Sequence, residues 1–269
     1  MGNSFSLHCD VRRKLLTLAL LSLPPMAWSV ATTEKRKVVI LLGETYAENY
    51  AEMFINDAYN SILKYVEQDL NISFDPYHYP WKRLLQRLAE GDGLAFGLSK
   101  TKERMQTLRF SDVAFSHHIW IVTRSDMTFP YANIADLKNK SVGIVRGASY
   151  GEEFDSYKNK LVSTDESLVS VPSRLKKLLT KRTDVMLIDH PSSDPAKVEA
   201  LINSTMTEVA ADTPMPAGIT FKVLSKPLTI DYIHFAILAE KDDGIIDKIN
   251  TALRRAKHLG ALPFVEPDK

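Results

Sequence analysis

Three polar side chains that lie close together in the sequence, Ser99, Thr101 and Arg104, could bind a small anion. The arginine guanidinium is a planar fork that keeps its charge at any relevant pH and matches a carboxylate with two parallel hydrogen bonds. Arg104 is therefore a candidate clamp for a ligand carboxylate, and Ser99 can donate to a carboxylate or accept from an ammonium group. The alternatives are a solvated Arg104, like nearby Lys102 and Arg109, and a Thr101 that only caps the following turn.

An aspartate at the end of an apolar run is a second candidate. Asp189 follows Val185-Met-Leu-Ile188, a run typical of a strand buried on both faces. Ligands of open α/β sheets bind at the carboxyl ends of strands, so this side chain is expected to face a crevice. The alternative is an ordinary turn aspartate before Pro191.

A third candidate group is Gly147, Ala148 and Ser149. The spacing of Ser149 and Glu152 fits a capping box at the start of a helix. A helix that begins after a glycine turn presents free N–H groups and the positive end of its dipole to an anion. Capping and ligand contact are both open for this segment.

Other kinds of chemistry have no signature in the sequence. Tyr46 and Trp81 are candidate aromatic walls for a ligand, although large aromatic side chains are more often part of a core. His117 and His118 would point to opposite faces of a strand, and His190 has no partner at metal-ligand spacing. Phosphate-cradling glycine loops and serine-nucleophile motifs are absent. We expect no catalytic residue, no metal and no cofactor.

The elements that position these residues alternate between strands and helices. The first half predicts strands at 37–42, 71–74 and 94–96, with helices at 48–69 and 81–91 between them. This β-α-β-α-β order predicts a parallel sheet with helices on its faces. The second half predicts strands at 119–123, 141–145, 185–188 and 232–239, a helical turn at 134–138, and helices from 152, at 174–181 and at 245–258, with 191–218 irregular. Two such sheets suggest two lobes with a ligand between them.

The N-terminus predicts export. Three basic residues, 12–14, precede the mostly apolar run Leu15 to Trp28 and then small residues, so 1–31 are interpreted as a signal peptide cleaved after Ala31. The myristoylation pattern of the first six residues is the weaker interpretation. The apolar run is shorter than the roughly 20 residues that span a bilayer, and a soluble periplasmic protein is expected.

Cleavage would remove the single cysteine, Cys9, so the mature chain would have no disulfide. It would also remove three of the 34 basic residues and one of the 33 acidic ones, which leaves 31 against 32. This balance gives no electrostatic case for a nucleic-acid partner or an anionic membrane.

A series of short motifs occurs in order over residues 78–260. They are Pro80-Trp-Lys-Arg-Leu-Leu with Glu90-Gly-Asp92, Ser99-Lys-Thr-Lys-Glu-Arg104, Phe110-Ser-Asp112, Ile134-Ala-Asp-Leu-Lys-Asn-Lys-Ser-Val-Gly143, Gly147-Ala-Ser-Tyr-Gly-Glu-Glu153, Thr183-Asp-Val-Met-Leu-Ile-Asp189 and the stretch from Phe235 to Gly260. Together they make the chain similar to the bacterial extracellular solute-binding proteins of family 3, the polar amino-acid-binding components of ABC importers.

The resemblance implies an α/β fold of the type II periplasmic-binding-protein class. It has two lobes, each with a flavodoxin-like parallel or mixed sheet, joined by a two-strand hinge that closes on a ligand. The crossing strands would lie near 116–118 and 230–235. Lobe 1 would comprise 32–116 and 235–269, and lobe 2 would comprise 117–234 with the hinge strands. A monomer is expected.

The resemblance also implies roles for the candidate residues. Arg104 matches the arginine that clamps the ligand carboxylate, and Asp189 matches the acid that binds the α-ammonium group. The segment of Gly147, Ala148 and Ser149 would hold the carboxylate from the second lobe, mainly through its backbone. Residues 43–50 depart from the family, because a short segment stands where an aromatic, proline-rich loop and a hairpin are usual. The resemblance therefore does not fix the ligand.

Three functions follow from these observations. The leading one is a periplasmic solute-binding protein, not an enzyme, that closes on an amino acid or related carboxylate for ABC-type import through a permease. The second is a receptor of the same fold that docks on a membrane sensor. The third is a lyase like the cyclohexadienyl dehydratases, with Asp189 or Glu44 as the acid.

Overall fold

The computed structural model describes residues 35–43, 51–158, 160, 162–167, 171–206, 209 and 218–262. The expected signal peptide, residues 1–31, and two residues considered above, Glu44 and Tyr46, lie outside this part. None of the helices in these ranges is long and apolar enough to cross a membrane.

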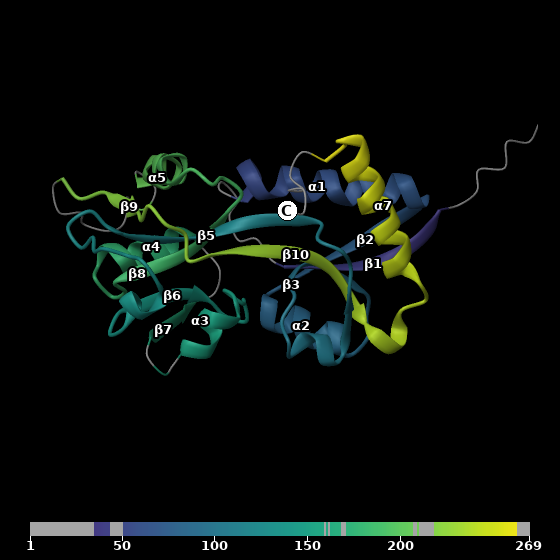
Figure 1. Cartoon of the computed structure of the whole chain (residues 1–269), viewed down its shortest axis with the longest axis horizontal. Helices are drawn as coiled ribbons and strands as arrows, with labels where there is room; N and C mark the ends of the chain where they lie inside the picture. The colour runs from purple at the N-terminus through teal and green to yellow at the C-terminus, as the bar shows by residue number, and fades with distance from the viewer. Residues whose placement is uncertain are drawn as a thin grey trace, which may run out of the picture. The chain divides into compact units, whose positions relative to one another are not determined.

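The first half of the chain forms the expected alternation of strands and helices (Figure 1). In order, the elements are β1 (Arg36–Gly43), α1 (Ala51–Leu70), β2 (Ile72–Tyr79), α2 (Trp81–Ala89), β3 (Leu94–Ser99), the 3-10 helix η1 (Arg104–Gln106) and β4 (Leu108–Phe110). β1 pairs in parallel with β2 and with β3, which confirms the predicted parallel β-α-β-α-β arrangement. α2 buries Leu84 and Leu88, as its apolar spacing predicts.

The second half contains one helix that the sequence interpretation missed. The elements are β5 (Phe115–Arg124), η2 (Ile134–Leu137), β6 (Ser141–Val145), α3 (Glu152–Tyr157), β7 (Ser163–Ser167), α4 (Val171–Leu179), β8 (Val185–His190), α5 (Pro195–Ser204), β9 (Phe221–Val223), β10 (Thr229–Leu238), η3 (Ala239–Lys241) and α7 (Ile245–Leu259). The expectation that 191–218 is irregular is wrong, because α5 lies within it. The side chain of Asp194 accepts from the backbone N–H of Ala196 at 2.9 Å, and Pro195 suits the first helical turn.

Two long strands connect all the others into one sheet. The strand order is β2-β1-β3-β10-β5-β8-β6-β7, with β4 on β10 and β9 on β5. β10 runs antiparallel to β3 and to β5, and β5 continues antiparallel to β8. Figure 1 shows β5 and β10 side by side between the two groups of strands. The two expected sheets are therefore joined into one curled mixed sheet. Each crossing strand is ten residues long; β10 pairs with β3 and β4, β5 pairs with β8 and β9, and the two strands pair with each other.

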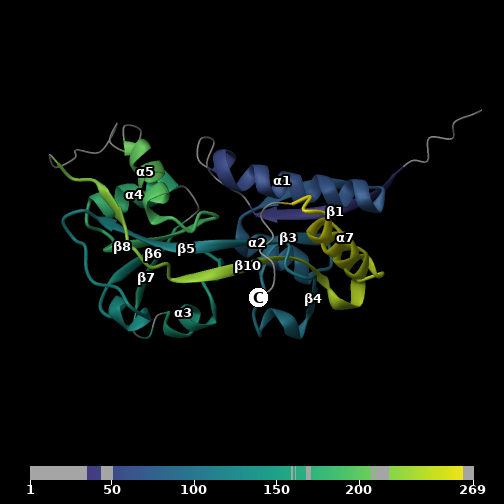
Figure 2. The same cartoon turned by 45° about the horizontal axis from the view of Figure 1, so that its top comes forward.

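Side-chain alternation divides the core around β1 and β3 into two hydrophobic clusters. Ile40 and Phe96 pack with α1 and α7 on one face of the sheet. Leu41 and Ala95 pack with α2 on the opposite face. Figure 2 shows α1 lying alongside β1. We call the face that carries α1 the α1 face.

The same alternation continues along β5 and β8. Ile121 and Leu187 pack with α3, whereas Trp120 and Met186 pack with α4 and α5. Phe115, at the start of β5, belongs to the α1 cluster and is in phase with Ile121 along the strand. The α1 face of the sheet therefore carries two separate apolar clusters, one toward each end of the crossing strands.

Candidate functional site

The Arg104 segment folds as a compact turn after β3. Nη1 of Arg104 donates to the backbone carbonyl of Ser99 at 2.9 Å, and the backbone N–H of Arg104 donates to Oγ1 of Thr101 at 3.2 Å. The second contact confirms the capping role predicted for Thr101. Among the described residues Arg104 has no ion pair, so one side of its guanidinium is fixed and the rest can still bind an anion.

Burial lowers the pKa of Arg104, and the nearby charges of Asp155, Asp231 and Glu103 oppose that shift. The guanidinium stays charged in any case, because its ordinary pKa lies far above neutral pH. Arg109 is exposed, as expected from the sequence, and it pairs with Asp242 at 2.5 Å and with Asp247 at 2.6 Å.

A bulge in β3 decides where Ser99 points. Ile233 pairs with Ser99 and the next pair joins His234 to Leu98, but Phe235 then pairs with Phe96, so Gly97 is skipped. Gly97 has φ +98°, a backbone conformation that suits glycine. The extra residue shifts the alternation by one position. Ser99 therefore lies on the α1 face with its pairing partner Ile233.

A patch of polar side chains separates the two apolar clusters of the α1 face. His117 of β5 lies, in the strand alternation, between Phe115 of one cluster and Ile119 of the other. Asp231 of β10 is the pairing partner of His117, and Asp189 of β8 is the pairing partner of Ile119. Since directly paired residues point to the same face, all three polar side chains lie on the α1 face. We call Ser99, His117, Asp189 and Asp231 the polar patch.

Hydrogen bonds connect three members of the polar patch. Oγ of Ser99 donates to Oδ2 of Asp231 at 2.7 Å, and Nε2 of His117 lies 3.3 Å from the same oxygen. A carboxylate only accepts, so Nε2 carries the proton in this contact. Both contacts use Oδ2, and none of the described residues donates to Oδ1. The side chain of Asp189 likewise has no hydrogen bond or ion pair within the part of the chain that the structure describes.

The charges of Asp189 and Asp231 both raise the pKa of two neighbouring side chains, His117 and Tyr59. Burial favours the neutral form of His117, but the hydrogen bond to Asp231 and the charges of Asp189 and Asp231 outweigh it, so the pKa of His117 is raised. Burial and the charges of Asp189 and Asp231 also raise the pKa of Tyr59, which packs against Phe115. Asp189 and Asp231 therefore both lie within electrostatic range of His117 and of Tyr59.

The predicted capping box at Ser149 is wrong. The residue that precedes α3 is Gly151, and it makes no side-chain cap. Oγ of Ser149 donates instead to Asp155 at 2.5 Å. Glu152, which was expected to return to the helix start, pairs with Lys102 at 3.0 Å and accepts from its backbone N–H at 3.2 Å. Lys102 is exposed, as expected, but it links the Arg104 turn to α3.

The remaining candidates occupy packed positions. Gly147 has φ +82°, and a Cβ there would lie 2.8 Å from the backbone nitrogen of Lys82. Ala148 packs against the cluster of α3. Trp81 belongs to the α2 cluster, and its ring lies 3.2 Å from where a Cβ on Gly97 would be. In this structure Trp81 is thus a packing residue of the α2 face, the alternative left open by the sequence.

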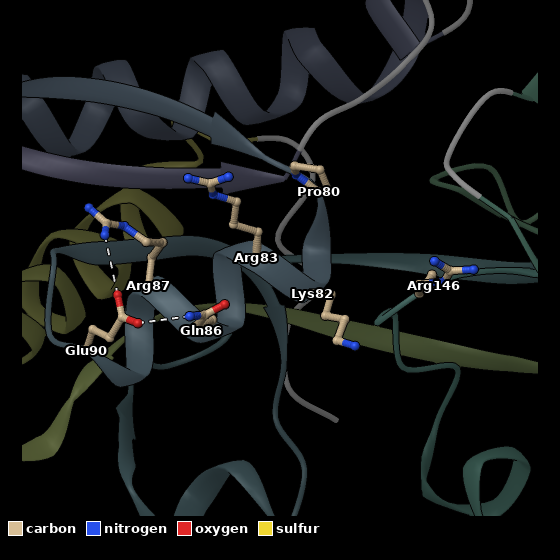
Figure 3. A pocket seen from close by; sticks show the side chains of 7 residues that line it. All are labelled: Pro80, Lys82, Arg83, Gln86, Arg87, Glu90 and Arg146. Carbon is tan, nitrogen blue, oxygen red and sulfur yellow. Dashed lines mark hydrogen bonds and ion pairs between the residues drawn. The ribbon is translucent and has the colours of Figure 1, made fainter.

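A separate hollow of about 540 Å³ lies along α2. Figure 3 shows the side chains that line it. Its lining is mostly basic and consists of Pro80, Lys82, Arg83, Gln86, Arg87, Glu90 and Arg146. Arg87 pairs with Glu90 at 3.4 Å and with Asp92 at 2.7 Å, and Arg146 pairs with Glu166 at 3.6 Å. None of the predicted site residues lines this hollow. We place the candidate site at the polar patch and Arg104, where acceptors and donors have no partner among the described residues.

The structure thus brings Ser99, Thr101 and Arg104 together and sets Asp189 on the same sheet face as Ser99. It adds two polar residues that the sequence interpretation did not select, Asp231 and His117. Each occupies an inward position in an otherwise apolar alternation, which is the signal that could have identified them. Within the described part of the chain no cluster of His, Cys, Asp and Glu could hold a metal ion.

Comparison with known families decides the class of this protein. Residues 54–263 match the model of the bacterial extracellular solute-binding proteins, family 3. The chain belongs to this family. The family consists of extracellular binding proteins, and the resemblance noted in the sequence is confirmed. No curated protein matches the chain at a significant level.

Solved structures share the fold of this family 3 protein at low sequence identity. The amino acid ABC transporter substrate-binding protein AbpA from Streptococcus pneumoniae, bound to L-arginine, has a TM-score of 0.61 at 16% identity, covering 84% of this chain and 91% of that one. A mutant of ArgBP from T. maritima has a TM-score of 0.61 at 18% identity, covering 84% and 92%. The GluR0 ligand-binding core from Nostoc punctiforme, in complex with L-glutamate, has a TM-score of 0.58 at 18% identity, covering 86% and 100%. The predicted fold class is therefore confirmed.

Proposed function

We propose that this family 3 solute-binding protein binds an amino acid at Arg104 and the polar patch. The observation that supports this most directly is the half-buried guanidinium of Arg104, which is fixed by the carbonyl of Ser99 but has no carboxylate partner among the described residues. Arg104 binds the α-carboxylate of the ligand and Asp189 binds its α-ammonium group. The neighbours bound to L-arginine and L-glutamate support an amino acid as the ligand class.

Closure of two lobes is the second part of the proposal. Lobe 1 comprises 32–116 and 235–269, and lobe 2 comprises 117–234. β5 and β10 act as the hinge, because β10 pairs with the strands of the first group, β5 pairs with those of the second, and their pairing with each other joins the two groups. Arg104 lies in lobe 1 and Asp189 in lobe 2, so a ligand that contacts both stabilises the closed state relative to the open one.

The location of the protein and its membrane partner are the third part of the proposal. The signal peptide, residues 1–31, directs the chain to the periplasm, where it is a monomer that delivers its ligand to an ABC permease. The second candidate is a receptor of the same fold that docks on a membrane sensor. A permease gene beside the coding gene favours transport, and turnover of prephenate by the purified protein would instead establish the lyase.

Thermal unfolding with a panel of amino acids and small organic acids tests the ligand class. A ligand at a hundred times its Kd stabilises the folded state by about 2.7 kcal/mol, and the Tm of a domain of this size should rise by about 5–10 °C. Failure of every carboxylate to raise the Tm contradicts the proposal.

The Arg104→Ala variant tests the site itself. We expect it to remove the ligand-induced rise in Tm and to leave the Tm of the free protein nearly unchanged, because the described residues offer Arg104 no ion pair to lose. Lys100→Ala, an exposed residue of the same loop, is the matched control and should keep the full rise. A large drop in the Tm of the free Arg104→Ala protein would assign Arg104 a structural role.

A further inference from the structure

The site contains more acidic than basic groups. Arg104 is its one permanent cation among the described residues, whereas Asp155, Asp189 and Asp231 all lie near it or in the polar patch. Asp155 accepts from Oγ of Ser149 at 2.5 Å and from the backbone N–H of Tyr150 at 3.3 Å. The side chain of Asp189 and Oδ1 of Asp231 receive no such contacts from the described residues.

A simple zwitterion does not balance these charges. Its carboxylate pairs with Arg104 and its ammonium group pairs with Asp189, which leaves Asp231 as an additional carboxylate. The side chain of Asp231 is only 11% exposed, so its charge is costly to bury without a compensating cation. His117 supplies that compensation when it is protonated, and a second cationic group on the ligand can supply it when His117 is neutral.

We propose that Asp231 is a specificity-determining residue whose Oδ1 accepts a hydrogen bond from a cationic group at the end of the ligand side chain. The site then prefers an amino acid with an ammonium or guanidinium side chain over a neutral one of the same size. Ser99 and His117 position the carboxylate by occupying Oδ2, so that Oδ1 is presented to the ligand. This inference rests on the amino-acid-binding function proposed above.

Calorimetric titration with L-arginine and with L-citrulline tests the inference. The two amino acids have the same length, but citrulline carries a neutral ureido group. A hydrogen bond to a charged group contributes about 1.5–3 kcal/mol, so the wild-type protein should bind L-arginine roughly ten to a hundred times more tightly. In Asp231→Asn the ratio of citrulline Kd to arginine Kd should fall to about one, while the Kd for citrulline changes little. Asp243→Asn, an exposed carboxylate paired with Arg36, is the control and should keep the wild-type ratio.

Each contrary result overturns the inference. Asp231 has another role if the wild-type ratio of citrulline Kd to arginine Kd is near one, or if the preference for arginine persists in Asp231→Asn. The same holds if that variant loses affinity for both ligands equally. If L-citrulline or L-glutamine binds in an Arg104-dependent way without any preference for L-arginine, the proposed function stands and this inference fails. If no amino acid binds to the wild-type protein, both fail together.

A measurement on the wild-type protein keeps the test valid if Asp231→Asn does not fold. The titratable groups on the same face as His117 are Asp231 of β10, Asp189 of β8 and Tyr59 of α1, whereas His190 of β8 pairs with His118 on the opposite face and interacts with His117 only electrostatically. As the pH falls through the raised pKa of His117, the imidazolium compensates Asp231 and repels a ligand cation. The ratio of citrulline to arginine Kd should therefore be larger at pH 8.5 than at pH 5.5. A ratio that is constant over this range, or larger at pH 5.5, contradicts the role of Asp231.

Discussion

Two neighbouring hydroxyl residues, Ser99 and Thr101, show how much a single side chain depends on its place in a turn. The hydroxyl oxygen of Thr101 accepts from the backbone N–H of Arg104, so its contact lies within the loop itself. The hydroxyl of Ser99 reaches Asp231, more than a hundred residues away in sequence, and its carbonyl oxygen holds the Arg104 guanidinium. Ser99 thereby links the basic and the acidic parts of the site.

His117 should make the stability of the protein depend on pH. Its pKa is raised in the folded state, so its contribution is fully present below the ordinary pKa of histidine and is lost as the pH rises through the raised value. Glutamine at this position can still donate to Asp231 but does not titrate. The cost of His117→Gln should be about 1.5–3 kcal/mol at pH 5.5 and smaller at pH 8.5, as measured by urea unfolding.

His78→Gln is the control for this measurement, because His78 is exposed on β2. Burial lowers the pKa of His190 and of His234, so their contributions to stability change with pH in the opposite direction to that of His117. Comparing each variant with the wild-type protein separates the contribution of His117 from theirs. A cost of His117→Gln that increases with pH contradicts the assignment.

At the scale of elements, two glycines with positive φ determine how the strands and loops present the site. Gly97 forms the bulge that places Ser99 on the α1 face. Gly147 allows the loop after β6 to approach the first turn of α2. The link between Lys102 and Glu152 joins the same two regions of the fold, since η1 and α2 belong to the first half of the chain and α3 to the second.

Gly147→Ala should weaken the approach of the β6 loop to α2. The new Cβ would lie 2.8 Å from the backbone nitrogen of Lys82, and backbone atoms there cannot move aside without shifting the helix. We expect a loss of about 1–3 kcal/mol in unfolding free energy beyond the cost of the left-handed backbone itself, together with a smaller ligand-induced rise in Tm.

Gly244→Ala is the matched control for Gly147→Ala. Gly244 has φ +89°, close to the value at Gly147, but a Cβ there would meet nothing within 4 Å. The difference between the two variants isolates the contact with Lys82. Equal losses in both would show that this contact contributes nothing.

For the whole molecule, the central feature is that β5 and β10 carry both the proposed hinge and part of the candidate site. The two strands pair with each other through Thr229–Ile233 and 115–119, and the polar patch is built on that paired region. Bending of these strands would move Arg104, which follows β3, relative to Asp189 on β8. Ligand binding and lobe movement are therefore expected to be coupled.

Closure predicts a smaller radius of gyration in the bound state. Small-angle scattering of the wild-type protein should show a decrease when a saturating amino acid is added, because the ligand contacts both lobes. The Arg104→Ala protein should show no decrease at the same ligand concentration. Tight binding of an amino acid to the wild-type protein with an unchanged radius of gyration would contradict the hinge.

Much of the fold could be predicted from local patterns. The apolar run before Gly43, the helical spacing after Trp81 and the run before Asp189 each correspond to an element of the structure. α5 was missed because Pro and Ser on its flanks hid a short helix, although Asp194 and Pro195 mark its start. The capping box was wrong because Ser149 and Glu152 found partners elsewhere in the fold, and no local pattern contains those partners.

The sequence by itself determined most of the elements, the family resemblance and the candidate role of Arg104, because these depend on residues that are close together along the chain. Only the tertiary structure decided that Ser99, His117 and Asp231 form one hydrogen-bonded group, since a single bulged residue at Gly97 sets the face on which Ser99 lies. It also decided that the acid nearest to Ser99 is Asp231 of β10. The physical reason is that strand pairing and register bring together residues that no short-range periodicity relates.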